Sequence, residues 1–310
     1  MSSRAPSVVV FSPAPLLTIT IETVTNNSPE IHRHAGGQGF WVARMVASIG
    51  VPVVLCGPFG DDSGFVLREL IASEGVGVRA IDVKAANGAY VHDRRSGERV
   101  VVAESRGGEL QRHEVDDFYD AALVMGLSAQ VTVLTGAPHK GVVPIDLFGR
   151  LSTDLRTNGA MVLADLCGDQ LRSALKGGLD LLKISHEEMI ADGYAESDTV
   201  EHLVVGIDAL QELGAENVVV TRSAKPALAR LEGKHYEVSG PKLEPRDYRG
   251  SGDSFTAGLA VGLATHLQLE DALCLAAAAG APNATRHGLG TGQRLDIEEM
   301  AKHISINALR

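Results

Sequence analysis

The chain has 310 residues, of which 28 are Lys or Arg and 39 are Asp or Glu, so its formal net charge at pH 7 is −11. An acidic chain of this kind lacks the clustered basic surface with which proteins bind nucleic acid. With 45% hydrophobic and 22% charged residues the chain is not disordered, and its length lies near the upper limit for one hydrophobic core.

The cysteines and the N-terminus indicate the compartment. Cys56, Cys167 and Cys274 lie far apart among apolar or small residues, which favours small core side chains in a reducing environment. The N-terminal apolar run is too short for a signal peptide, and no stretch approaches the roughly 20 apolar residues that span a bilayer. These observations predict a cytoplasmic protein that has neither a membrane nor a nucleic acid as its partner.

The first third of the chain mixes βα units with helix-poor stretches. Val8–Phe11 is typical of a short buried strand, and residues 16–24 alternate apolar side chains with Thr or Glu, which indicates a strand with one wet face. The elements expected next are a glycine-rich turn over 34–39, a helix over 41–49, a strand over 51–56, a loop over 57–64, a helix over 65–74, and extended runs over 78–83, 89–92 and 99–104. Ser96-Gly97 predicts a hairpin turn. We expect residues 12–35 and 78–106 to form one small sheet.

From about residue 112 the pattern alternates regularly between helix and strand. The expected strands are 131–135, 161–165, 179–184 and 217–221, and the expected helices are 142–157, 168–175, 186–192 and 199–213. Buried strands that alternate with helices form right-handed crossovers, and these give a parallel sheet covered on both faces. The sequence therefore predicts an α/β fold with a mainly parallel sheet.

One glycine-rich turn carries the clearest chemical signal. Gly250, Ser251 and Gly252 precede Asp253 and an apolar helical run, so the first N–H groups of that helix are unobstructed. A helix N-terminus of this kind is a receptor for anions. The Asp253 carboxylate would be close to an anion bound there, although Asp253 is equally compatible with a simple N-cap.

Several motifs together resemble the PfkB, or ribokinase-like, carbohydrate kinase family over nearly the whole chain. The motif Asp247-Tyr248-Arg249-Gly250-Ser251-Gly252-Asp253 is similar to the family's Asp-Thr-Thr/Val-Gly-Ala-Gly-Asp, and Gly36-Gly37-Gln38-Gly39 is similar to its Gly-Gly-Lys-Gly. Three further segments resemble the branch that includes 1-phosphofructokinase and tagatose-6-phosphate kinase, namely Ser12-Pro13-Ala14, Asp165-Leu166-Cys167-Gly168 and Lys183-Ile184-Ser185-His186-Glu187-Glu188.

The resemblance implies a single ribokinase-like domain over 1–310, with a small β lid that often forms a homodimer. It implies an ATP-dependent kinase that phosphorylates a hydroxyl of a sugar, a sugar phosphate or a sugar-like molecule. Asp253 would then be the general base, and the amides of Gly250, Ser251 and Gly252 would stabilise the phosphoryl group in transfer.

The resemblance also assigns the cofactor side. Glu188 would hold Mg²⁺ through water, with Ser185 in place of the family's Asn. Without the family, acids at this position are simply favoured in the first turn of a helix. The other residues implied for ATP are Lys183, Thr221, Arg249, Asn283, Gly288 and Gly290. The nucleotide loop after Thr221 usually reads Ser/Thr-x-Gly-x-x-Gly, whereas here Ser223 and Pro226 replace both glycines.

The substrate side departs most from the family pattern. The implied substrate residues are Ser12, Gly36, Gly37, Gln38 and Trp41. Leu16 replaces the family's Asp, Gln38 its Lys and Trp41 its Asn, and residues 85–88 contain no arginine. Positive charge could come instead from neighbouring basic residues, namely Arg33, His34, Arg106 and Arg249. Alternatively the acceptor is unphosphorylated and stacks on Trp41, although Trp41 also fits a plain core position.

Two other function classes compete with the kinase. The altered substrate positions and the missing loop glycines favour a ligand-binding or regulatory protein on the same scaffold that has lost efficient turnover, whereas Gly250, Gly252, Asp253 and Glu188 oppose it. A nucleotide-dependent oxidoreductase is disfavoured because no Gly-x-Gly-x-x-Gly follows the first strand.

Overall fold

The computed structural model describes residues 7–23, 28–139, 141–241, 250–283, 290 and 292–309. Apolar strands assemble into a ten-stranded sheet in the order β14-β13-β12-β11-β10-β9-β8-β1-β4-β5. Its strands are β1 (Val8–Phe11), β4 (Val53–Gly60), β5 (Gly77–Val83), β8 (Val131–Thr135), β9 (Val162–Asp165), β10 (Leu179–Ser185), β11 (Ala215–Arg222), β12 (Lys225–Leu231), β13 (Lys234–Ser239) and β14 (Ser305–Ala308).

Neighbouring strands from β11 across to β5 are parallel, and β12 to β14 extend the sheet in antiparallel fashion. The helices that connect or follow them are α1 (Gln38–Ile49), α2 (Asp61–Ser73), α3 (Arg112–Ser128), α4 (Asp146–Thr157), α5 (Gly168–Gly177), α6 (His186–Ala191), α7 (Val200–Glu212), α8 (Ser251–Ala264), α9 (Leu269–Asn283) and α10 (Arg294–Ala301). The α/β fold with a mainly parallel sheet is therefore confirmed.

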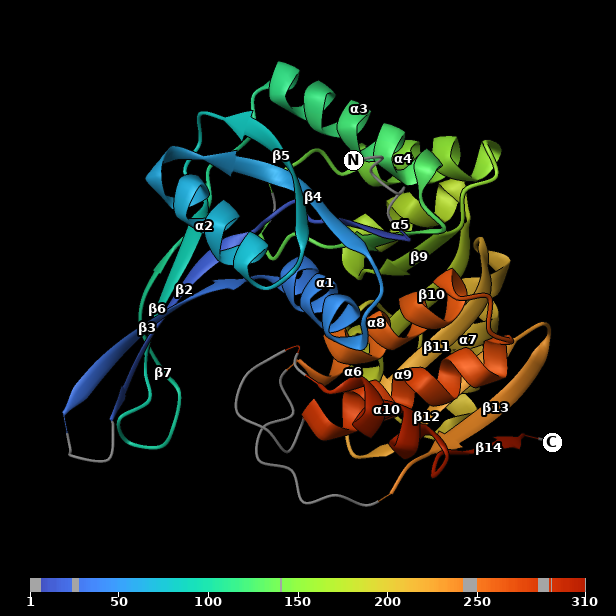
Figure 1. Cartoon of the computed structure of the whole chain (residues 1–310). Helices are drawn as coiled ribbons and strands as arrows, with labels where there is room; N and C mark the ends of the chain where they lie inside the picture. Colours follow the sequence, from blue (N-terminus) through green and yellow to red (C-terminus); the bar gives the residue numbers. More distant parts are fainter. Residues whose placement is uncertain are drawn as a thin grey trace.

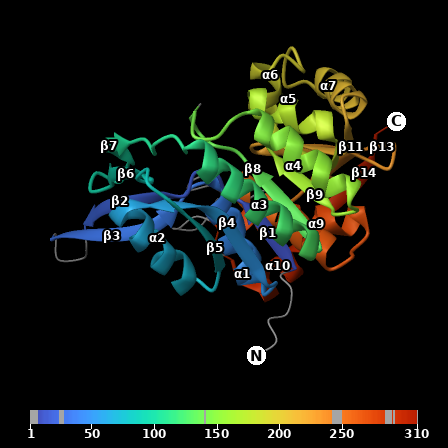
Figure 2. The same ribbon diagram turned by 90° about the horizontal axis from the view of Figure 1, so that it is seen from above.

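Helices cover both faces of the large sheet (Figures 1 and 2). One hydrophobic cluster joins α1, α8 and α9 to inward-pointing strand residues such as Val8 and Val10. The other cluster joins α3, α4, α5 and α7 to residues of the opposite face, such as Val9 and Phe11. Successive residues of β1 thus enter different cores, as the period of two in a strand requires.

A second, four-stranded sheet projects from the main body (Figure 1), in the order β3-β2-β6-β7. Its strands are β2 (Leu16–Thr23), β3 (Pro29–Gly36), β6 (Gly88–Asp93) and β7 (Val100–Ser105), and we call this four-stranded sheet the lid. The two helix-poor regions do meet in space, because β2 from the first pairs with β6 from the second. Gly97 occupies a left-handed turn between β6 and β7, as Ser96-Gly97 predicted.

Two sequence expectations about these regions are wrong. The proposed lid range of 78–106 starts too early, since β5 pairs in parallel with β4 and belongs to the large sheet. The loop expected over 57–64 does not exist: β4 runs to Gly60, and α2 begins at Asp61. Glycines within 57–64 suggested a loop, yet Gly57 and Gly60 lie where neighbouring backbone leaves no room for a Cβ.

In the part of the chain that the structure describes, no helix combines the length and the apolar character needed to cross a bilayer.

Candidate active site

Several of the predicted site residues lie at one edge of the large sheet. Because β1, β8, β9, β10 and β11 are parallel, their carboxyl ends share that edge. The edge carries Asp165 at the end of β9, Lys183 and Ser185 at the end of β10, and Thr221 on β11 beside Ser185. In open α/β sheets ligands bind outside the carboxyl ends of the strands.

The N-terminus of α1 packs directly on this edge. A Cβ at Gly39 would lie 2.5 Å from Ser12 Oγ and 3.0 Å from Thr135 Oγ1, so only glycine allows the first turn of the helix to approach the ends of β1 and β8. Gly37 precedes the helix at φ 96, a left-handed conformation that favours glycine. The Gly-Gly-Gln-Gly motif thus has a clear structural purpose in joining lid strand β3 to α1.

The N-terminus of α8 faces the same edge. Gly250 is its N-cap in a left-handed conformation, and Asp253 lies in its first turn. A Cβ at Gly252 would come within 3.0 Å of Lys183 Nζ, so this helix end is close to the lysine. Ser251 Oγ is buried and has no hydrogen-bond partner among the described residues.

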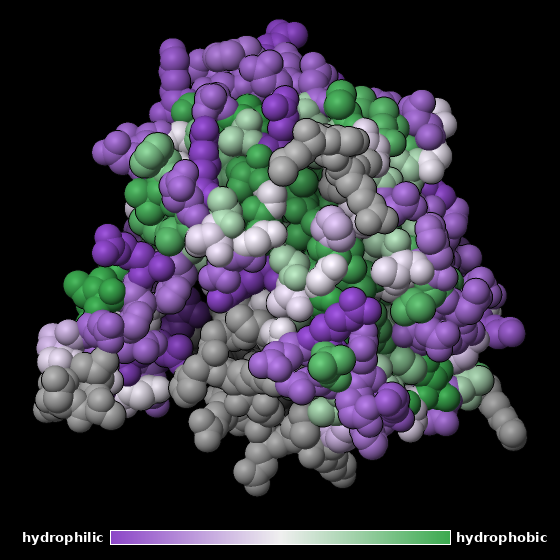
Figure 3. Space-filling view, in the orientation of Figure 1, coloured by the Kyte–Doolittle hydropathy of each residue, from purple (hydrophilic) through white to green (hydrophobic). Residues whose placement is uncertain are grey.

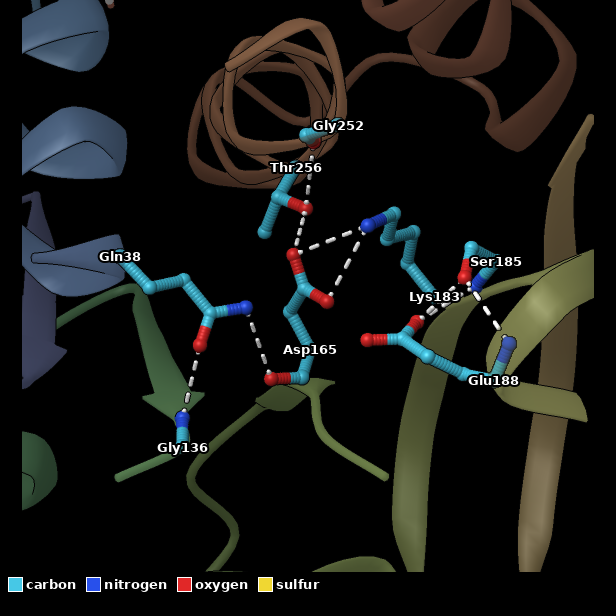
Figure 4. A network of polar contacts seen from close by, with 8 residues as sticks. All are labelled: Gln38, Gly136, Asp165, Lys183, Ser185, Glu188, Gly252 and Thr256. Carbon is cyan, nitrogen blue, oxygen red and sulfur yellow. Dashed lines mark hydrogen bonds and ion pairs between the residues drawn. The ribbon is translucent and has the colours of Figure 1, made fainter. Parts of the chain in front are cut away.

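Asp165 holds these parts together (Figure 4). Lys183 Nζ lies 3.2 Å from both of its carboxylate oxygens, and the Thr256 hydroxyl donates to Asp165 Oδ2 over 2.6 Å. Asp165 and Lys183 are 2% and 5% exposed, so this ion pair is shielded from water. It connects the end of β9, the end of β10 and the first turns of α8.

The surroundings of Asp253 raise the pKa of its carboxyl group. Removal from water, followed by the Asp165 and Glu188 carboxylates, raises the pKa of Asp253 to about 7, and Lys183 opposes the rise. Burial would lower the pKa of Lys183, but Asp165, Glu188 and Asp253 outweigh it and raise the pKa, so Lys183 remains an ammonium. Burial also raises the pKa of Asp165 against the opposing effects of Lys183 and Thr256.

Glu188 and Ser185 form a capping box at the start of α6. Glu188 Oε2 accepts from Ser185 N over 2.9 Å and from Ser185 Oγ over 2.7 Å, and Ser185 Oγ accepts from Glu188 N. This geometry agrees with the interpretation that acids are favoured in the first turn of a helix, and it fixes Glu188 beside the cluster. The described residues contain no group of three His, Cys, Asp or Glu side chains able to hold a metal ion.

Both ends of the Gln38 side-chain amide bind backbone groups of the protein. Its Nε2 donates to the Asp165 carbonyl oxygen over 3.2 Å, and its Oε1 accepts from Gly136 N over 2.9 Å. Trp41 is partly buried, packs at 4.9 Å from the Phe40 ring, and has Arg44 over its ring. These contacts match the core interpretation of Trp41 better than a stacking platform.

The remaining predicted residues are less informative. Ser12 is buried at the end of β1, Gly36 ends β3, and the Thr221 carbonyl accepts from His186 Nδ1 over 3.3 Å. Gly290 lies against the Trp41 backbone. Asn283 ends α9 and nothing is described of its side chain, and Arg249 and Gly288 lie outside the described residues.

Sequence reasoning missed the structural centre of the site. Asp165 was noticed only as part of a motif, although a carboxylate that ends a buried apolar strand is itself a signal for a site at the sheet edge. Thr256 follows Asp253 by three residues and therefore lies on the same helix face, which was a second available signal. Cys167, expected in the core, is exposed, whereas Cys56 is buried.

A cleft with a cavity volume of about 40 Å³ lies where the lid joins the main body. Its walls are mostly small or apolar, from residues such as Ala14, Leu16, Ala85 and Ala86, and they also include Arg106 and His139. In Figure 3 the lid projects from the main body at the lower left.

The chain is similar in sequence to proteins of one family. The sequence model of the family described as "pfkB family carbohydrate kinase" matches residues 12–295 of this chain. A 1-phosphofructokinase of Vibrio cholerae is 25% identical over 278 residues, which cover 89% of this chain and 87% of that protein. A tagatose-6-phosphate kinase of Staphylococcus epidermidis is 23% identical over 295 residues, or 94% of each chain.

Solved structures show the same fold. Phosphofructokinase-2 from Escherichia coli in complex with potassium has a TM-score of 0.86 at 23% identity, over 96% of this chain and 98% of that one. Ribokinase of Arabidopsis thaliana complexed with ribose and ATP has a TM-score of 0.75 at 22% identity, over 96% and 99%. The ribokinase-like fold predicted from the sequence is therefore confirmed.

Proposed function

The chain belongs to the pfkB family of carbohydrate kinases, and on that basis we propose that the sheet edge around Asp165 is its phosphoryl-transfer site. The family makes the protein a phosphotransferase that uses ATP and an alcohol acceptor. The observation that carries the assignment of the site is Asp253 in the first turn of α8, beside Lys183 and Asp165.

Asp253 acts as the general base. Its carboxylate takes the proton of the acceptor hydroxyl while that oxygen attacks the γ-phosphorus of ATP, and ADP leaves. Its raised pKa suits this role, because a base works best when its pKa is close to the working pH. The N–H groups at Gly250, Ser251 and Gly252, together with Lys183, stabilise the negative charge on the phosphoryl group.

The cofactor side fits a phosphate chain and a magnesium ion. The unpartnered Ser251 hydroxyl and the lysine beside Gly252 suit the oxygens of phosphates. Mg²⁺ keeps several waters and takes few carboxylates, so Glu188 would hold it through water. When bound, the ion neutralises charge on the phosphates. Thr221 and Ser185 would line the nucleotide, Arg249 would lie beside the anion-binding turn, and Asn283, Gly288 and Gly290 belong to the segment that closes over the adenine in the family.

The acceptor is a sugar or a sugar phosphate. The kinases of fructose 1-phosphate and tagatose 6-phosphate among the relatives support a phosphorylated acceptor. Gln38 and Ala85 cannot supply the positive charge of the family residues that they replace. Arg106 and His139 in the wall of the cleft are candidates to bind an acceptor phosphate, with Gly36 and Gly37 on the sugar.

We further propose a cytoplasmic homodimer that associates through the lid. Strand β7 is an edge strand of the lid, which pairs with β6 on one side only among the described strands. Its residues Val100, Val101 and Val102 are 52%, 59% and 58% exposed. An apolar edge of this kind is usually covered in a functional assembly.

The decisive experiment measures ADP formation from MgATP with a panel of acceptors: fructose 6-phosphate, fructose 1-phosphate, tagatose 6-phosphate, the parent sugars and nucleosides. The expected result is turnover with at least one acceptor. Asp253→Asn should reduce that turnover by about 10²- to 10⁴-fold with ATP binding retained, since general-base help is of that size.

The binding-protein alternative makes the opposite prediction. In that case the wild-type chain would bind ATP by calorimetry and yet release no ADP with any acceptor. Wild-type turnover in Asp253→Asn would remove Asp253 from the mechanism.

A further inference from the structure

Gln38 uses both ends of its amide on the backbone of the site. Nε2 donates to the carbonyl of Asp165 and Oε1 accepts the N–H of Gly136 (Figure 4). Gly136 follows β8 and Asp165 ends β9, so one side chain joins two neighbouring strand ends. An amide is the side-chain group that can donate to a carbonyl and accept from an N–H at the same time.

The same residue begins α1, which Gly37 alone separates from lid strand β3. One side chain therefore connects the end of lid strand β3, which we call the lid root, to the end of β9. The Asp165 carboxylate then contacts Thr256 and Lys183, and Thr256 lies one turn after Asp253 on α8. A continuous set of contacts connects the lid to the first turns of the helix that carries the base.

We propose that Gln38 is a positioning residue that aligns Asp165, and through it the start of α8, with the lid root, and that it does not bind the acceptor. This proposal rests on the proposed function for its consequence in catalysis. Its structural part, the connection between Gln38 and α8, stands apart from the identity of the acceptor.

Three substitutions separate the two halves of the amide. Gln38→Met has a similar length and removes both contacts. Gln38→Glu keeps the acceptor for Gly136 N but sets a carboxylate oxygen against the Asp165 carbonyl. Gln38→Lys keeps a donor for that carbonyl but leaves Gly136 N without its partner.

A matched control is available on α5. Gln170 Nε2 donates to the Ala137 carbonyl over 3.0 Å, and Gln170 Oε1 accepts from Ala137 N over 3.1 Å. Gln170→Met therefore removes the same two kinds of hydrogen bond one residue from Gly136, but without a contact to Asp165.

The first experiment measures amide hydrogen exchange by mass spectrometry on the full chain, without added ligand. In Gln38→Met we expect faster exchange in peptides that cover Gly136 and in peptides that cover 251–256. In Gln170→Met only peptides around Ala137 should change. Unchanged exchange over 251–256 in Gln38→Met would overturn the proposal, whether or not an acceptor has been found.

The second experiment uses the acceptor with the highest turnover in the panel above. Gln38→Met should lower kcat by about 10- to 100-fold, because small misplacements of catalytic groups cost that much, and should change the acceptor KM by less than about threefold. Gln38→Glu and Gln38→Lys should each lower kcat as well. A raised acceptor KM with an unchanged kcat would instead make Gln38 a substrate-binding residue and would refute the proposal.

Discussion

Asp253 combines two properties that a kinase base needs. It lies at the positive end of α8, where an anion is stabilised, yet its neighbours include the carboxylates of Asp165 and Glu188. Removal from water and these like charges raise its pKa to about 7, against the ordinary value of 3.8. The group is therefore a stronger base than a surface aspartate.

This pKa predicts the acidic limb of the pH–rate profile. Activity requires the ionised carboxylate, so kcat/KM for the acceptor should fall as the pH drops through about 7, with a slope of one proton. The measurement is a set of initial rates between pH 5 and pH 9 at saturating MgATP. A limb centred near pH 4 would mean that Asp253 keeps an ordinary pKa.

The same shift predicts a pH-dependent stability. Because the folded protein binds this proton more tightly than the unfolded chain, the free energy of unfolding falls as the pH rises from about 4 to about 7. Asp253→Asn lacks the titration, so it should melt on the order of a few degrees above the wild type at pH 8 and at the same temperature at pH 4. Equal melting temperatures at both pH values would contradict a raised pKa.

At the level of elements, the contact between α8 and β9 depends on one hydroxyl. Thr256→Val removes the donor to Asp165 Oδ2 at nearly constant shape. We expect a loss of about 1–3 kcal/mol in the free energy of unfolding, because a buried charged acceptor loses a partner. Kcat should fall as well, since the first turns of α8 carry Asp253. Denaturant melts and initial rates measure both effects.

Thr256→Ser is the control for this prediction. Serine restores the hydroxyl and loses only a methyl group, so most of the stability and most of the turnover should return. If the serine variant behaved like the valine variant, packing of the methyl group rather than the hydrogen bond would explain the loss.

In the turn between β11 and β12, the backbone of Ser223 has a strained, left-handed conformation. Ser223 stands where the family pattern has a glycine, and it adopts φ 53. A left-handed conformation costs an L-residue about 1–2 kcal/mol, and glycine avoids this cost. Glycine also makes the unfolded chain more flexible, which offsets part of the stabilisation. Ser223→Gly should therefore raise the free energy of unfolding by about 0.5–1 kcal/mol, as urea melts would report. Ala224→Gly, at a residue with negative φ, should lower it.

Elements with a regular apolar period were predictable, and those shaped by distant contacts were not. The strands of the parallel region and the helix after Gly250 follow from local pattern, because each buries its own apolar face. Strand β5 was assigned to the lid because it lacks an evident flanking helix, yet it pairs with β4 and contacts both α2 and α3. The antiparallel strands β12 to β14 were missed. For β14 the reason is that its partner β13 lies about 70 residues earlier in the chain.

The residues of the site that belong to known motifs were predictable from the sequence, whereas the contacts around Asp165 were not. Asp253, Lys183 and Glu188 follow from motifs, and the structure brings all three near Asp165. The orientation of Gln38 could not be foreseen, because it depends on Gly136 and Asp165, which lie 98 and 127 residues away in sequence. A motif match carries over the position of a residue but not the direction of its side chain.

In the whole molecule, the lid is the surface through which we propose that the homodimer forms. If β7 forms the dimer contact, Val101→Lys should convert the dimer to a monomer in sedimentation velocity experiments, because it inserts a charge into an apolar edge. Val205→Lys, at a 67% exposed valine on α7, is the control and should leave the dimer intact. Loss of the dimer in both variants, or in neither, would place the contact elsewhere.

The packing of α1 against α8 also has a consequence for synthesis on the ribosome. These helices cover the same face of the sheet over Val8 and Val10 (Figure 1), yet α1 ends at Ile49 and α8 begins at Ser251. At translation rates of about 5–20 residues per second, the apolar face of α1 waits roughly 10–40 s for its partner. The nascent chain therefore exposes the apolar face of α1 through most of its elongation.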